Sequence, residues 1–167
     1  TCLDTSGIMF PKKHTGTDQI SEREISLTGI SENMASDRME KTEQLMSVTD
    51  LVMLDIKHIN DEEHQKLTGQ SNSNILAFAR YLDSIGKPVW IRHVVVPGIT
   101  FDEKELTELG LFLKTLHNVE KLEVLPYHSM GKVKYDNLGM DYVLKDTPQL
   151  TKAEAKEAEN MIRAAMK

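Results

Sequence analysis

The chain has 167 residues, a formal net charge of -6 at pH 7 and 40% hydrophobic residues, which is the size and composition of one globular domain. The acidic balance leaves no broad basic surface, so we expect a small molecule or a protein as the partner, with no nucleic acid and no membrane. No signal-peptide pattern and no apolar run near the roughly 20 residues of a membrane span are present, and the single cysteine, Cys2, suits a reducing compartment. A cytoplasmic protein is predicted.

The first residues, Thr-Cys-Leu-Asp-Thr, are typical of the end of a strand. We therefore expect the chain to begin inside a fold, with a segment upstream of it. Residues 11–38 are polar and have no sustained hydrophobic period, which predicts an insertion or a flexible loop.

From Asp50 onward, strand and helix patterns alternate. The run at 51–56 is continuously apolar, as expected of a strand buried on both faces of a parallel sheet. Apolar spacing and capping residues then predict, in order, a helix at 61–67 between Asn60 and Gly69, a helix at 73–85, a strand at 89–96 and a helix after Thr100 or Asp102. A strand at 121–125 and a last helix that begins with a capping box of Thr151 and Glu154 follow. Residues 129–150 have no run long enough for an element, which suits a loop over an active site or one packed on the rim of the sheet.

This alternation predicts an α/β fold with a parallel sheet, either open or closed as a barrel. Ligands of such folds bind beyond the carboxyl ends of the strands. Four groups of polar residues fall there: Asp4 with Thr5, Asp55 with Lys57, Arg92 with His93, and His128. Each group alone has an ordinary structural role available to it, but four at consecutive strand ends predict a site for a charged, hydroxyl-rich ligand.

Two other motifs are set aside. The stretch Asp4-Thr5-Ser6-Gly7 has one residue too many for the aspartic protease loop, and it lies in an α/β pattern. His58 and His64 are six residues apart, which does not match the i, i+4 pair of a helical zinc site, and no Cys-x-x-Cys is present.

The amino-acid sequence at the strand ends resembles that of the pyruvate formate-lyase activating enzymes, a family of radical S-adenosylmethionine (SAM) proteins. Four motifs support the resemblance, in chain order: Thr1-Cys-Leu-Asp-Thr-Ser-Gly7, Val48-Thr-Asp-Leu-Val-Met-Leu-Asp-Ile-Lys57, Val89-Trp-Ile-Arg-His-Val-Val-Val-Pro-Gly98 and Leu125-Pro-Tyr-His128. The similarity covers residues 1–10 and about 40–167, and the segment from Pro11 to about Met39 departs from it.

The resemblance implies that residues 1–167 form one domain, the C-terminal part of a partial (β/α)6 TIM-like barrel with parallel strands. It also implies an oxidoreductase of anaerobic glucose metabolism that cleaves SAM at a 4Fe–4S cluster and generates a glycyl radical on pyruvate formate-lyase. That enzyme would be the protein partner, with an electron donor such as flavodoxin.

Site residues follow from the same resemblance. It implies that SAM is contacted by Asp55, Ile56, Lys57, Arg92, Val94 and His128, and that a monovalent cation is bound by Asp4, Thr5, Met53 and Asp55. Lysine facing the methionine carboxylate is a natural charge pair, and oxygen ligands suit a hard cation.

The cluster is where the chain departs from the family. Three cysteines hold it in the family, and this chain has only Cys2. We therefore expect the 4Fe–4S ligands to be missing here and the chain alone to be inactive, with no catalytic residue of its own. A barrel without its first strands is also expected to fold weakly or to associate through the exposed edge of its sheet.

Two hypotheses of other classes remain open. The first is a non-catalytic fragment or protein-binding module. The second is a barrel lyase in which Lys57 forms a Schiff base, although the neighbouring Asp55 would keep that lysine charged.

Overall fold

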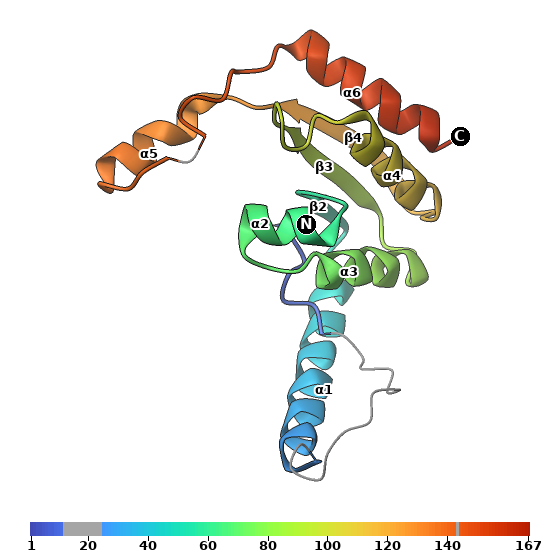
Figure 1. The fold of residues 1–167 in the computed structure, drawn as a ribbon. Coiled ribbons are helices and arrows are strands. Elements are labelled where there is room, and N and C mark those ends of the chain that lie inside the picture. Colours follow the sequence, from blue (N-terminus) through green and yellow to red (C-terminus); the bar gives the residue numbers. More distant parts are fainter. Residues whose placement is uncertain (12–24, 143) are drawn as a thin grey trace.

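The computed structural model describes residues 1–11, 25–142 and 144–167, and its centre is a parallel sheet of four strands in the order β1-β2-β3-β4 (Figure 1). The strands are β1 (Cys2–Thr5), β2 (Leu51–Asp55), β3 (Val89–Val95) and β4 (Val119–Pro126). The register pairs Asp4 with Met53 and Asp55 with Arg92. These features confirm the α/β prediction.

The helices connect and cover these strands. They are α1 (Ile25–Ser47), α2 (Asp61–Thr68), α3 (Ser73–Ser84), α4 (Glu103–Lys114), α5 (Lys132–Asn137) and α6 (Lys152–Ala165), with a short 3-10 turn η1 at Ser129–Gly131. Among these described residues, no helix is both long and apolar enough to cross a membrane.

Local chemistry sets the helix ends. Asn60 accepts a hydrogen bond from the backbone of Glu63 at the start of α2, and Gly69 ends that helix with φ 75°. Asp102, rather than Thr100, caps α4. Thr151 and Glu154 form the predicted capping box of α6. These caps are confirmed because each depends on residues close together in sequence.

The core lies on one face of the sheet. Alternate residues of β2 and β3 are buried, among them Val52, Leu54 and Ile91, and they pack with buried residues of α3, α4 and α6. The intervening residues, such as Met53 and Arg92, are only half-buried. The expectation that 51–56 is buried on both faces is therefore wrong in the part of the chain described, because the second face of β2 is left partly open.

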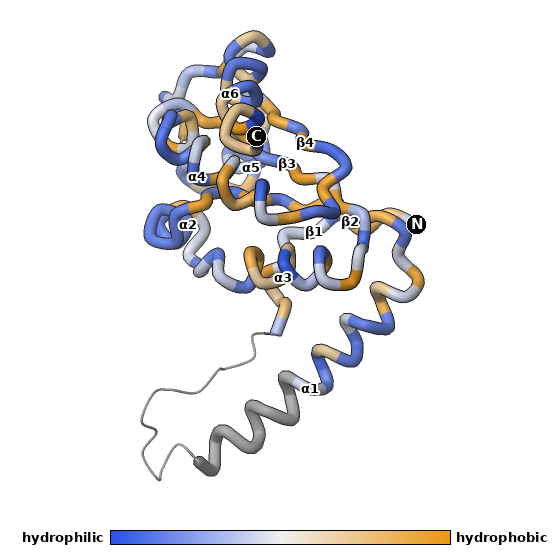
Figure 2. The backbone as a smooth tube through the Cα atoms, turned by 90° about the vertical axis from the view of Figure 1, so that its right-hand side faces the viewer, coloured by the Kyte–Doolittle hydropathy of each residue, from blue (hydrophilic) through white to orange (hydrophobic). Residues whose placement is uncertain are grey.

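Two helical segments correct the sequence-based expectations. Residues 25–38 belong to α1, so the prediction of an insertion or a flexible loop is wrong for this part of the segment. Residues 12–24 fall outside the described residues, and an insertion there stays a prediction. In Figures 1 and 2, α1 extends away from the sheet, and most of its coloured part is hydrophilic. The stretch 129–150, expected to have no element, contains η1 and α5.

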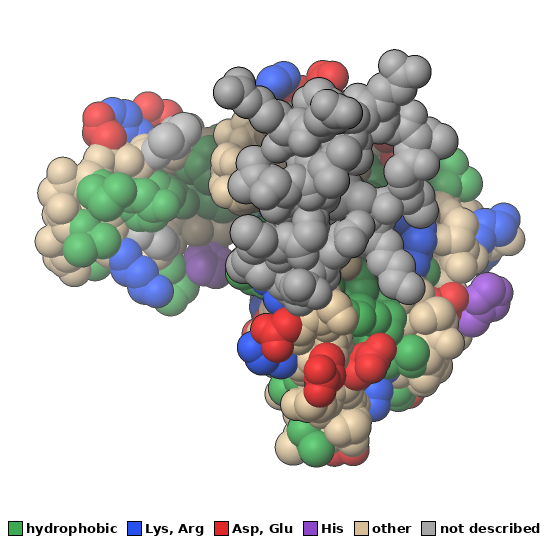
Figure 3. Space-filling view, turned by 90° about the horizontal axis from the view of Figure 1, so that it is seen from below, with side chains coloured by type: hydrophobic (Ala, Val, Ile, Leu, Met, Phe, Trp, Pro, Cys, Tyr) green, Lys and Arg blue, Asp and Glu red, His purple; other side chains and the backbone are tan. Residues whose placement is uncertain are grey.

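The segment around α5 projects away from the sheet, at the left of Figure 1, and has an apolar surface. Met130, Val133, Leu138 and Met140 are 75%, 61%, 71% and 55% exposed. Figure 3 shows hydrophobic side chains gathered on this projection, at the left of that view. We call residues 129–142 the α5 arm.

Candidate functional site

Three charged residues meet on the open face of the sheet: Asp4 and Asp55 near the carboxyl ends of β1 and β2, and Arg92 at the middle of β3. Arg92 reaches from β3 across β2, where its Nε donates to Asp55 Oδ1 at 2.6 Å and its Nη2 donates to Asp55 Oδ2 at 3.2 Å. The same Nη2 donates to Asp4 Oδ1 and Oδ2 on β1, at 2.8 and 3.1 Å. One guanidinium therefore bridges two carboxylates from two other strands.

Lys57 adds a second positive charge to this cluster. Its Nζ donates to Asp55 Oδ2 at 2.9 Å, and its side chain is 40% exposed, against 15% for Asp55. Burial alone would raise the pKa of Asp55, but hydrogen bonds from Arg92 and Lys57 outweigh burial and lower it. Hydrogen bonding to Asp55, opposed by burial and assisted by Asp4, raises the pKa of Arg92. Asp55 is therefore ionised at neutral pH.

Met53 and Thr5 are placed differently from each other. The Met53 sulfur accepts from Arg92 Nη1 at 3.0 Å and so belongs to the cluster. Thr5 Oγ1 instead accepts from the backbone N–H of Gly7 at 3.0 Å, and Thr5 lines a small apolar pocket with Phe10 and Phe78. Because adjacent residues of a strand point to opposite faces, the Thr5 side chain is directed away from Asp4.

The same alternation separates Ile56 and His93 from the cluster. Ile56 is 1% exposed and in the core. His93 Nδ1 donates to the Ile56 carbonyl at 2.7 Å, and His93 Nε2 is buried without a partner. Burial lowers the pKa of His93 to about 4, so this imidazole is neutral and structural. Because side chains alternate along β3, Arg92 lies on the face of the site and His93 lies on the opposite face.

A pocket of about 730 Å³ opens beside Lys57. Its walls include Val94, Thr100, Tyr127, Tyr135 and Tyr142. The hydroxyl groups of Tyr127 and Tyr142 lie 3.0 Å apart, and this hydrogen bond, with burial, raises the pKa of Tyr142 to about 12. His128 follows Tyr127 and is exposed. Among the predicted SAM residues, Lys57 and Val94 line this pocket.

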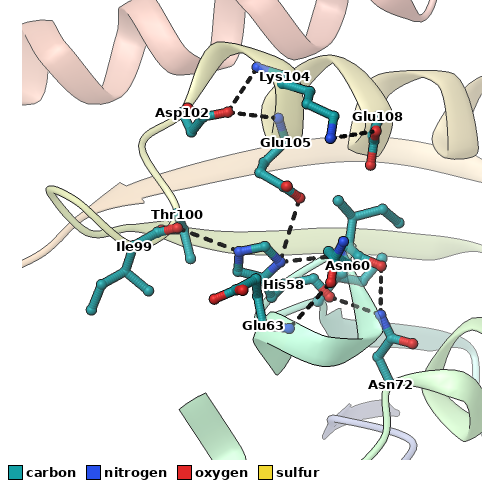
Figure 4. A network of polar contacts seen from close by, with 12 residues as sticks. His58, Asn60, Glu63, Asn72, Ile99, Thr100, Asp102, Lys104, Glu105 and Glu108 are labelled. Carbon is teal, nitrogen blue, oxygen red and sulfur yellow. Dashed lines mark hydrogen bonds and ion pairs between the residues drawn. The ribbon is translucent and has the colours of Figure 1, made fainter. Parts of the chain in front are cut away.

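His58 fixes the loop that follows Lys57, as Figure 4 shows. Its ring is buried, its Nδ1 accepts from the Asn60 N–H at 3.1 Å, and its Nε2 lies 3.3 Å from the Ile99 carbonyl. Asn72 Nδ2 donates to the carbonyls of His58 and Ile59 at 3.1 and 2.6 Å. The loop is thus tied to α3 and to the segment that precedes α4. This is the structural role of His58, a residue that sequence reasoning weighed only as a metal ligand.

Sequence reasoning also missed an aromatic contact on the open face. Lys121 Nζ lies 4.5 Å from the centre of the Trp90 ring and 2.8 Å from Glu123 Oε1. In the register of the sheet, Trp90 pairs with Lys121 and Arg92 pairs with Glu123. The period-two pattern of β3 and β4 was the available signal, because it assigns these residues to the face of Asp55.

Comparison with known proteins confirms the resemblance. The chain is 52% identical over 124 residues to a pyruvate formate-lyase-activating enzyme of Streptococcus mutans, covering 74% of this chain and 47% of the relative. It is 50% identical over 116 residues to the enzyme of the same name from Staphylococcus epidermidis, covering 70% of this chain and 46% of that protein. No protein-family model matches the chain.

A solved structure supports the fold. A domain of a pyruvate-formate lyase-activating enzyme from Bacteroides vulgatus superposes with a TM-score of 0.61 over 75% of this chain and 69% of that domain, at 20% identity. The fold is therefore α/β, with a four-stranded parallel sheet and helices as in partial TIM-barrel domains. The chain spans about half the length of the curated relatives that it matches, and it is their homologue over that half.

Proposed function

We propose that this homologue of pyruvate formate-lyase-activating enzymes supplies the SAM-binding strands of such an activating enzyme, acting in the cytoplasm on pyruvate formate-lyase as its protein substrate. The supporting observation is that Lys57 lies between an ionised carboxylate, Asp55, and a large open pocket at the carboxyl ends of the strands. Ligands of parallel α/β folds bind at this edge.

The residues around the pocket have the groups that SAM requires. The Lys57 ammonium can pair with the methionine carboxylate, since an ammonium and a carboxylate form a strong charge-assisted hydrogen bond. Val94 offers an apolar wall, and His128, Arg92 and the Ile56 backbone are the further proposed contacts. Asp55 accepts a hydrogen bond from Lys57 Nζ at the edge of the pocket that Lys57 lines.

The 4Fe–4S cluster would supply the electron that cleaves SAM, delivered by a donor such as flavodoxin. Cys2 is the single cysteine of the chain, and it is exposed. Because such a cluster is held by several thiolates, its ligands would have to come from residues outside this chain. The chain's own residues would then bind and orient SAM, and we expect no radical chemistry from the chain alone.

The monovalent cation proposed at Asp4, Thr5, Met53 and Asp55 fits this arrangement poorly. Both carboxylates already accept hydrogen bonds from Arg92, and the Thr5 hydroxyl faces the opposite side of β1. The donor set is of the right chemistry, but its carboxylate oxygens are engaged by Arg92.

A protein-binding module is the second candidate, and the α5 arm favours it. Met130 and Leu138 are among the most exposed large apolar side chains of the described residues, and exposed apolar patches mark interaction surfaces. The lyase hypothesis gains no such support, because Lys57 Nζ is engaged by the Asp55 carboxylate at 2.9 Å.

Equilibrium dialysis of the chain against radiolabelled SAM tests the proposal. We expect saturable binding that is weakened about tenfold or more in Lys57→Met, since a charge-assisted hydrogen bond is lost. Lys121→Met is the matched control, because Lys121 lies on the same face and contacts Trp90 and Glu123 instead. Equal binding by the wild type and Lys57→Met would contradict the assignment of Lys57.

A further inference from the structure

The guanidinium of Arg92 fills the space between the residues expected to bind a cation. Nε donates to Asp55, Nη2 donates to both Asp55 and Asp4, and Nη1 donates to the sulfur of Met53. All three nitrogens are engaged, and the Arg92 side chain is only 22% exposed. An ion placed between Asp4 and Asp55 would have to take the same oxygen atoms.

The charges of the cluster are balanced without an ion. Asp4 and Asp55 contribute two negative charges, and Arg92 and Lys57 contribute two positive ones. A guanidinium is weakly hydrated, so it loses little hydration free energy when it leaves water, and its planar fork matches a carboxylate. A compact alkali ion must give up a tightly held hydration shell to occupy the same place.

We infer that Arg92 and a monovalent cation compete for the carboxylates of Asp4 and Asp55, so that the cation binds only when the guanidinium moves away. Arg92 is thus the resident counter-ion of this pair, and cation binding would release its side chain from both carboxylates. The inference rests on the proposed function only for the choice of site.

Competition reduces the apparent affinity for the cation. When the binding-competent state is a minor one, the apparent dissociation constant rises by the inverse of its population. A largely buried, forked arginine–carboxylate pair stabilises the state in which Arg92 is bound. The state that can bind a cation is therefore populated to about a tenth or less. Removing the guanidinium should therefore tighten sodium binding about tenfold or more.

Sodium-23 NMR line broadening, with potassium as competitor and choline chloride holding the ionic strength constant, tests this on the full chain without SAM. We expect Arg92→Gln to bind sodium saturably and at least about tenfold more tightly than the wild type does. Lys121→Gln, which removes a positive charge from the same face without touching Asp4 or Asp55, should behave as the wild type. Adding Asp4→Asn to Arg92→Gln should abolish the gain.

The inference is overturned if sodium binds the wild type as tightly as Arg92→Gln, or if neither binds it. If Arg92→Gln does not fold, Arg92→Lys takes its place, because a point charge cannot form the fork, and the same two outcomes decide. Since no SAM is present, either failure leaves the proposed SAM contact of Lys57 untouched, and that contact is judged by dialysis alone.

Discussion

Acid should destabilise the folded chain through His93, a buried imidazole on the covered face of β3. Its pKa falls from 6.5 to about 4, chiefly through burial and despite the hydrogen bond to the Ile56 carbonyl. Below pH 6.5 the unfolded chain binds a proton at this position and the folded chain does not. The neutral His93 therefore makes its full contribution to the unfolding free energy above pH 6.5, and this contribution is lost as the pH falls toward 4.

The magnitude follows from the difference between the two pKa values. At about 1.4 kcal/mol for each pH unit, the difference between 6.5 and about 4 amounts to about 3 kcal/mol of unfolding free energy. Urea unfolding at pH 7, 6, 5 and 4 measures it. His93→Gln keeps a donor for the Ile56 carbonyl but has no titrating group, so its stability should fall by about 3 kcal/mol less over this range.

Carboxylates also titrate in this range, so the comparison between variants is decisive. His128→Gln removes an exposed histidine and should show the same pH dependence as the wild type. Parallel curves for His93→Gln and the wild type would refute the argument, since the loss of stability in acid would then come from groups other than His93.

Two further changes test the packing and the caps. Gly110→Ala places a Cβ 2.4 Å from the Ile162 carbonyl oxygen and 2.6 Å from the Ala165 Cβ, so we expect a loss of about 1–3 kcal/mol in urea unfolding. Leu111→Ala, on the exposed side of α4, should change stability far less, and an equal loss would show that α4 and α6 do not approach so closely. Thr151→Ala removes the side chain that accepts from the Glu154 N–H and should lower the unfolding free energy by about 1 kcal/mol, measured by thermal melting. Thr151→Ser should retain most of this stability. No change in Thr151→Ala would mean that the capping box does not form.

Local chemistry made much of the fold predictable. Asn60, Gly69 and the Thr151–Glu154 pair mark helix ends through contacts with residues a few positions away. The two helices that were missed lacked such marks. The start of α1 lies in polar sequence without a hydrophobic period, and α5 is only 6 residues long, too short for a periodic pattern to emerge.

The site was predicted in outline, because polar residues at strand ends converge in any parallel sheet. Period-two alternation would also have separated Arg92 from its neighbour His93 before the structure was known. The bridge from Arg92 across β2 to Asp4 could not be predicted in this way. It depends on a side chain spanning two strands, and it joins residues 88 positions apart in the chain.

The central claim is that this chain supplies working SAM-binding strands of an activating enzyme. A chimera tests it most directly, in which the matching 124 residues of this chain replace their counterpart in the Streptococcus mutans relative. After anaerobic reconstitution, 5′-deoxyadenosine formation and the glycyl radical of pyruvate formate-lyase are measured by chromatography and electron paramagnetic resonance. At subsaturating SAM we predict both products at comparable rates from the chimera and its Lys121→Met variant, and formation at least about tenfold slower from its Lys57→Met variant. A chimera that folds and assembles its cluster but forms no 5′-deoxyadenosine would contradict the claim.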